Sequence, residues 1–283
     1  MKLSLKTIAG AATLAAALCL TLTPSAQAQG SSETTISTGH FTDIDAADFS
    51  KSIERDLADK GARIALVFRT GRTRDKLPDS INYTHGAFWV YQAFQTPNGE
   101  IMTGYNTWNL FHGDGEDMPQ TQSYLAEEFP FTFVSASAVD DVAVIIPTPN
   151  MQDRLLELLA SEAYLELHNR NYSLISNPAD ESFQNCVEFL LDVVSAAAWD
   201  TTDQAQLKAN IAAHFEPSEI EAGLFARLFG PLADERLRLA DHRGAAIQTA
   251  TYESLSTFMI EHGLADETYK LAFERNESVP TSG

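Results

Sequence analysis

The residue best suited to a chemical reaction is Cys186, in the run Gln184-Asn185-Cys186-Val187-Glu188. Asn185 is a good helix N-cap, and Glu188 three residues later completes a capping-box pattern, so Cys186 should be the first residue of a helix. Backbone N–H groups at that position favour a thiolate and can stabilise an oxyanion formed on a carbonyl. The sequence therefore predicts a nucleophile at Cys186, with Gln184 and Asn185 supporting the cap and the oxyanion site. The alternative is a small core residue at a helix start.

A cysteine nucleophile needs a general base, and His85 is the histidine best placed for that role. It opens an aromatic-rich strand, residues 83–95, which a hairpin sequence joins to a second strand, residues 101–111. The other six histidines lie in the leader, at expected helix ends, in a polar loop or, for His112, at the end of the second strand.

The hairpin register predicts the partner of His85. If Thr96 faces Glu100 across the turn, Asn109 projects from the same face as His85, one step along the neighbouring strand. Asn109 would then hold the second imidazole nitrogen. A single bulge would bring His112 to that role instead. Both residues could also be ordinary polar groups near a hairpin end.

Three arginines follow an apolar strand at 62–68. Arg69, Arg72 and Arg74 could bind a carboxylate, such as the end of a peptide or of a cell-wall stem. A solvated basic loop explains them equally well. No paired histidine or cysteine spacing indicates zinc, and the acidic loops do not match a calcium-binding pattern, so we expect neither metal nor cofactor.

The order of histidine, polar residue and cysteine resembles that of circularly permuted papain-like enzymes, which include lecithin:retinol acyltransferase relatives and permuted NlpC-type cell-wall peptidases. The string Asn185 to Phe189 looks like the Asn-Cys-Glu-His-Phe motif of the acyltransferase branch, with Val187 where that motif has Glu. Over nearly its whole mature length the chain also resembles a bacterial secreted family catalogued as domain of unknown function 2145. The matching runs are residues 62–71, 83–87, 137–147 and 184–186.

The elements that must position these residues follow a mixed pattern of helices and strands. Strands gather in the middle of the chain and helices flank them, which favours an α+β fold. The resemblance implies a permuted papain-like core with a central antiparallel sheet packed on helices, plus a helical C-terminal extension. Expected helices are 46–60, 151–168, 186–199, 203–214, 218–229 and 252–263, and further strands are 129–135, 141–146 and 246–251.

The N-terminus reads as an export signal. Lys2 and Lys6 precede an apolar segment, residues 8–21, that is too short for a stable membrane span, and Ala26-Gln27-Ala28 fits the small-x-small cleavage rule. We therefore expect a signal peptide over 1–28, a flexible leader over 29–45 and one domain over 46–283, with a core of about 46–200 and an extension of about 201–283. The expected location is the periplasm or the outside, without a membrane anchor.

Net charge and cysteine content restrict the classes of partner and reaction that the chain could have. The net charge is −20, which argues against a nucleic-acid or anionic-lipid partner because both need a basic surface. Cys19 lies in the expected signal, so Cys186 would be the single cysteine of the mature chain. The leading hypothesis is a periplasmic cysteine hydrolase or acyltransferase acting on an amide or ester, with peptidoglycan stem peptides as candidate substrates. The alternative is a non-catalytic periplasmic binding or assembly module.

We predict that the mature protein begins at Gln29, because Ala28 ends the small-x-small site. Intact-mass measurement of protein recovered from the periplasm checks this prediction. A retained and acylated Cys19 in that spectrum would contradict it and would also remove the argument from a lone cysteine.

Overall fold

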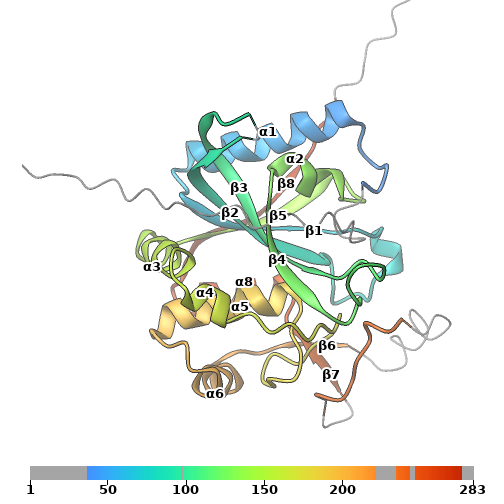
Figure 1. Ribbon diagram of the computed structural model, residues 1–283, viewed down its shortest axis with the longest axis vertical. Coiled ribbons are helices and arrows are strands. Elements are labelled where there is room, and N and C mark those ends of the chain that lie inside the picture. Colours follow the sequence, from blue (N-terminus) through green and yellow to red (C-terminus); the bar gives the residue numbers. More distant parts are fainter. Residues whose placement is uncertain (1–36, 97, 221–233, 243–245, 276–283) are drawn as a thin grey trace, which may run out of the picture.

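The structure is a computed structural model that describes residues 37–96, 98–220, 234–242 and 246–275 (Figure 1). The predicted signal peptide and its cleavage site lie outside the described residues. The first described residues, 37–42, belong to the expected flexible leader, but they are bonded to the fold. Thr38 N donates to Ser135 O at 3.2 Å, and the His40 ring lies 2.9 Å from Asp140. The ordered domain therefore begins earlier than predicted.

A six-stranded antiparallel sheet forms the centre of the molecule, in the order β4-β3-β2-β1-β5-β8. It confirms the predicted α+β class with a central antiparallel sheet. The strands are β1 (Ile64–Arg69), β2 (His85–Gln95), β3 (Ile101–His112), β4 (Ser123–Glu128), β5 (Asp141–Pro147) and β8 (Ala265–Ala272).

Helices cover both faces of this sheet (Figure 1). On one face lie α1 (Asp43–Asp59) and α2 (Pro130–Ser135). The other face carries α3 (Pro149–Leu159), α4 (Ala163–Glu166), α5 (Cys186–Trp199) and α8 (Tyr252–Glu261), with α6 (Gln204–His214) packed outside α5. A short 3-10 helix, η1 (Arg74–Lys76), and a two-stranded sheet of β6 (Ser218–Ile220) and β7 (Ile247–Thr249) complete the described elements.

Strand β1 shows why the chain forms two core layers. Every residue of β1 is buried, because alternate side chains point to opposite faces and helices cover both. Leu66 and Phe68 pack toward α5, whereas Ala65 and Val67 pack toward α1. A continuous apolar run is therefore the expected sequence of this strand.

Four expectations from the sequence differ from the structure. Residues 130–135 form a helix rather than a strand, because Pro130 occupies its first turn and suits a helix start better than a strand interior. The segment expected as one helix over 151–168 is divided into α3 and α4. The segment expected as a helix from 218 begins as β6, and residues 221–229 lie outside the described residues. In the described part of the C-terminal extension, strands accompany the helices, and β8 joins the central sheet beside β5.

The predicted hairpin register is correct. Thr96 N donates to Glu100 O at 2.8 Å, and Phe88 pairs with Trp108. Strands β2 and β3 pair from Phe88 to Gln95, whereas the first residues of β2, including Gly86, pair only with β1. The two strands therefore separate at the end that carries His85.

Gly86 lies where α5 crosses the start of β2, and its missing side chain permits that approach. A Cβ atom at Gly86 would lie 2.7 Å from Leu190 Cδ1 and 2.7 Å from Phe68 Cδ1. We predict that Gly86→Ala lowers the free energy of unfolding by about 1–3 kcal/mol through overpacking. Urea denaturation followed by circular dichroism measures this change.

Gly104 in β3 provides the matched control. A Cβ atom there would meet Phe94 at 3.7 Å, which is an ordinary contact. Gly104→Ala should change the free energy of unfolding by less than about 0.5 kcal/mol. Equal effects of the two substitutions would show that α5 does not press on Gly86.

Candidate active site

The predicted N-cap of α5 is present. Asn185 adopts an extended conformation, and its Oδ1 accepts from the backbone N–H groups of Val187 at 3.0 Å and Glu188 at 2.9 Å. Its Nδ2 donates to Thr249 Oγ1 at 3.2 Å, which fixes the cap from the opposite side. The reciprocal half of the capping box is absent among the described residues, because the Glu188 carboxylate binds Lys208 instead. Cys186 is the first residue of α5, as predicted.

The Cys186 sulfur lies against the backbone at the start of β2. Sγ donates to the Thr84 carbonyl at 3.7 Å, and the backbone N–H of Gly86 donates to the sulfur. Thr84 and Gly86 are the residues before and after His85 in the sequence. Because β2 has separated from β3 here, the N–H of Gly86 is directed to the thiol rather than to a neighbouring strand. The side chain is 5% exposed. The sulfur is therefore held between a helix terminus and the two residues that flank His85.

Burial dominates the titration of this thiol. It raises the pKa of Cys186 above its usual value, although the N–H of Gly86, the Arg69 guanidinium and the first N–H groups of α5 all act to lower that pKa. The N–H groups at the helix start do favour the thiolate, as expected, but burial outweighs them in this closed arrangement. Desolvation penalises the charged form more than the nearby donors stabilise it.

His85 makes the predicted bond to Asn109. The distance from His85 Nε2 to Asn109 Oδ1 is 3.0 Å, while Asn109 Nδ2 donates to Thr107 Oγ1 at 2.9 Å. Since the amide nitrogen is used as a donor, Oδ1 is the acceptor and Nε2 of His85 carries the proton. In the neutral ring, the lone pair is then on Nδ1. Asn109 therefore fixes the tautomer of His85 as well as its orientation.

Aromatic rings and burial keep His85 neutral. Its ring stacks on Phe111 at 5.2 Å and lies 5.7 Å from Phe133 of α2. Burial holds the pKa of His85 well below its usual value, and the Arg69 charge lowers this pKa further, against the raising effect of the Asn109 bond. At neutral pH, His85 is thus an uncharged imidazole that can accept a proton.

The structure places Cys186 and His85 at the same point of β2 but on different sides of it. The His85 ring faces α2, whereas the thiol belongs to the core beneath α5. Among the described residues, no hydrogen bond joins Sγ to the imidazole; the contacts of the sulfur are to the flanking backbone groups. The hydrogen bond that would join a cysteine nucleophile to His85 as its base is therefore not made in this arrangement.

His112 does not take the place of Asn109. Its Nδ1 donates to Gly113 O at 2.7 Å, so its Nε2 accepts from Arg236 Nη1 at 3.1 Å. Its ring packs on Tyr172 at 5.3 Å, on the α5 side of the sheet. Both ring nitrogens are engaged, and neither binds His85. The sequence offered no signal for Arg236, because that residue lies far along the chain in a polar segment.

Gln184 is a structural residue rather than a donor to an oxyanion. Its Nε2 donates to Asp192 Oδ2 at 2.6 Å and to Leu167 O at 3.1 Å, and its Oε1 accepts from Asn169 N at 2.9 Å. These bonds fix the loop before α5. The hydrogen-bond donors near the sulfur are instead backbone N–H groups.

The three predicted substrate-binding arginines do not form one site. Arg69 is the last residue of β1 and is buried, with Nη1 donating to Ala136 O at 2.8 Å. Arg74 forms a bidentate ion pair with Asp141, at 2.9 and 2.6 Å. Arg72 is exposed. Arg69 acts on the thiol site through its charge.

A buried ionic cluster lies further along α5. Lys208 of α6 is 6% exposed, and its Nζ donates to Glu188 Oε1 at 2.7 Å and to both carboxylate oxygens of Asp192, at 2.8 and 2.9 Å. Burial raises the pKa of Glu188 and of Asp192, and Lys208 opposes both shifts. This cluster, which the sequence did not indicate, fixes α6 to the helix that carries Cys186.

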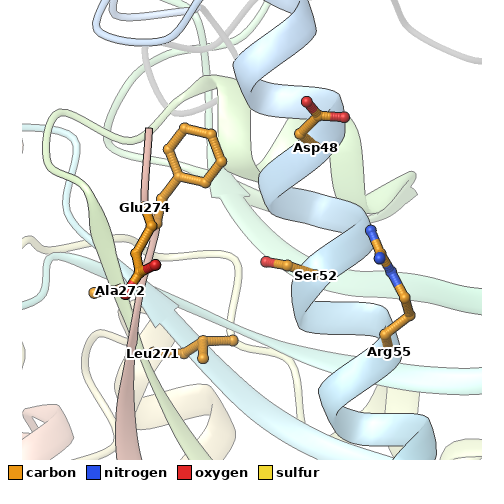
Figure 2. Close-up of a pocket in the computed structure, with 7 residues that line it drawn as sticks. Asp48, Ser52, Arg55, Leu271, Ala272 and Glu274 are labelled. Atoms are coloured by element: carbon orange, nitrogen blue, oxygen red, sulfur yellow. The ribbon is translucent and has the colours of Figure 1, made fainter. Parts of the chain in front are cut away.

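Two surface pockets lie away from Cys186. Figure 2 shows the larger pocket, of about 550 Å³, where Asp48, Ser52 and Arg55 of α1 face the end of β8. The smaller lies beside α3, near Arg154. Over the described part of the chain, no three His, Cys, Asp or Glu side chains are grouped as metal ligands, and no helix has the length and apolar character needed to cross a membrane.

The profile of the family DUF2145, described as an uncharacterized protein conserved in bacteria, matches residues 56–259. The chain belongs to this family. The DUF2145 match runs from the last turns of α1 into α8 and includes His85, Asn109 and Cys186, whereas β8 follows it in the sequence. No curated protein and no solved structure matches the chain.

Lys208 should be essential for stability in this DUF2145 protein. We predict that Lys208→Met lowers the free energy of unfolding by about 3–5 kcal/mol, because it leaves two buried carboxylates without a counter-charge. Adding Glu188→Gln and Asp192→Asn should restore much of this loss. Urea denaturation of the single and triple variants checks both statements, and a single variant as stable as the wild type would contradict the importance of the ion cluster.

Proposed function

We propose that this protein is a cysteine hydrolase or acyltransferase of papain-like type that acts on an amide or ester outside the cytoplasm. The observation that carries the proposal is the bond from His85 Nε2 to Asn109 Oδ1, beside a cysteine at a capped helix start. A polar side chain that fixes the imidazole tautomer is the arrangement a cysteine nucleophile needs from its base.

Cys186 would act as the nucleophile. Because the thiol and the imidazole lie on different sides of β2, the start of this strand must first move to bring Nδ1 of His85 to the sulfur. The thiol proton then passes to His85 Nδ1, the sulfur forms a bond to the acyl carbon, and the bond from that carbon to the leaving nitrogen or oxygen breaks. His85 then returns the proton to the leaving amine or alcohol. Water releases the acyl group in a hydrolase, whereas an amine or alcohol releases it in a transferase. The N–H groups of Gly86 and Cys186, which face the sulfur, are positioned to stabilise the oxyanion, since the N–H of Val187 is used by the Asn185 cap.

Reaction requires the start of β2 to open. Cys186 is 5% exposed and His85 is 1% exposed, so a substrate reaches them only after Thr84 and its neighbours move from the sulfur. The same movement would hydrate the thiol and reduce the desolvation that raises its pKa. Opening and activation of the nucleophile would therefore occur together.

Periplasmic location and peptidoglycan stem peptides remain parts of this proposal. They rest on the signal-like N-terminus and on the resemblance to permuted cell-wall peptidases. The competing function is a binding or assembly module in which Cys186 is a core residue. The burial of both Cys186 and His85 favours that second reading.

The test is acylation of the mature protein by purified stem peptides and by an activated thioester, followed by intact-mass spectrometry. We expect an adduct on Cys186 that Cys186→Ser abolishes. His85→Ala should slow acylation by about 10²–10⁴-fold, as loss of a general base does, and Asn109→Ala should have a smaller effect. Because the resting thiol is protonated, the rate should rise with pH through the neutral range.

Two outcomes would contradict the catalytic proposal. One is an acylation rate that His85→Ala leaves unchanged, which would mean that the imidazole moves no proton. The other is a folded protein whose Cys186 reacts with neither acyl donor until it is denatured. The second outcome would identify the thiol as a packed core group and support the binding module.

A further inference from the structure

We propose that Arg69 supplies a permanent positive charge to the Cys186 site, so that His85 works there as a neutral base rather than as the imidazolium of an ion pair. This inference rests on the proposed function, since it assigns a role within the same site. It gives Arg69 a charge-supplying role in the site of Cys186, His85 and Asn109, where the sequence indicated Arg69 only as a candidate for binding a substrate carboxylate.

Arg69 and His85 are neighbours in the sheet. They are register partners, because Arg69 ends β1 directly opposite the first residue of β2. Both side chains pack against Phe133 of α2. The guanidinium carbon of Arg69 lies 5.2 Å from the Phe133 ring centre, and the ring centres of His85 and Phe133 are 5.7 Å apart. Nη1 of Arg69 also donates to Ala136 O. The guanidinium is thus fixed in the protein beside the imidazole.

Thr84 connects Arg69 to the thiol. Its backbone N–H donates to Arg69 O at 3.0 Å, and its carbonyl accepts from Cys186 Sγ at 3.7 Å. Its hydroxyl accepts from Gly71 N at 3.0 Å and so fixes the turn that follows Arg69. A single residue therefore links the strand end that carries the cation to the sulfur.

The charge of Arg69 disfavours the charged form of His85 but favours the charged form of Cys186. Burial is the largest influence on each, but Arg69 lowers the pKa of His85 and also lowers the pKa of Cys186. It disfavours an imidazolium and favours a thiolate. His112 also lowers the pKa of His85. Burial lowers the pKa of Arg69 itself only to about 10, so its positive charge persists at neutral pH.

Glu128 is the counter-charge of Arg69. It ends β4 opposite Thr107, on the side of the sheet that carries His85 and Asn109. Burial raises the pKa of Glu128 to about 7, and Arg69 acts to lower it. Removing this carboxylate while keeping Arg69 should strengthen the effect of the cation on its neighbours. Glu128 therefore offers a variant that acts in the direction opposite to loss of Arg69.

The experiment is a pH titration of the mature protein by NMR, using the Cβ shift of Cys186 and the ring shifts of His85. Arg69→Met should raise both midpoints, each by about one unit, as loss of a nearby cation does. Arg69→Lys should keep both close to the wild type. Glu128→Gln should lower the midpoint of Cys186 and keep His85 neutral to lower pH. Arg55→Met, in the exposed part of α1, is the control and should move neither.

The inference is overturned if folded Arg69→Met leaves both midpoints unchanged, or if Glu128→Gln raises that of Cys186. Should Arg69→Met fail to fold, Glu128→Gln and Arg69→Lys decide the matter. The titration uses no substrate, so its outcome is separate from the acylation test. If the midpoints shift but Cys186 is not acylated, the proposed effect of the Arg69 charge is supported and the proposed enzymatic function is rejected.

Discussion

The contact on which the candidate site depends is the seating of the N-terminus of α5 against the separated start of β2. Asn185 caps the helix, and Gly86 allows Leu190 to approach the strand. The sulfur of Cys186 contacts backbone groups at the start of β2 that do not pair with β3. A side chain at Gly86, or a β3 paired to the end of β2, would close the place where the thiol lies. The helix and the strand therefore define the site jointly.

Buried charged side chains lie on both faces of the sheet near this contact, each with an oppositely charged group close by. One face of the sheet buries Arg69 with Glu128 close enough to act on it, and the other buries Lys208 with Glu188 and Asp192. Such groups add little net stability compared with apolar packing, but removing one partner is costly. Their placement on β1, β4 and α5 means that the strand end and the helix start are held by specific polar contacts as well as by packing.

Local patterns predicted the elements that carry the candidate site better than the contacts between them. The cap at Asn185, the helix from Cys186 and the hairpin register that puts Asn109 on the same face as His85 follow from residue spacing, and all three are present. The sequence did not predict which side of β2 the His85 ring occupies relative to the thiol, because that depends on how α5 and α2 pack. Arg236 and Lys208 were missed for the same reason: their partners are distant in the sequence.

The position of β8 has a consequence for how the protein reaches its native state. This strand pairs with β5 across most of the second half of the chain, joining Val142 to Leu271, and it is the last described element. Contacts of such long range form slowly, because the loop between them must close first. Until β8 arrives, the buried strand β5 is an open edge that can pair with another chain. A chaperone that shields β5 should therefore raise the folding yield more than one that acts on the local hairpin of β2 and β3.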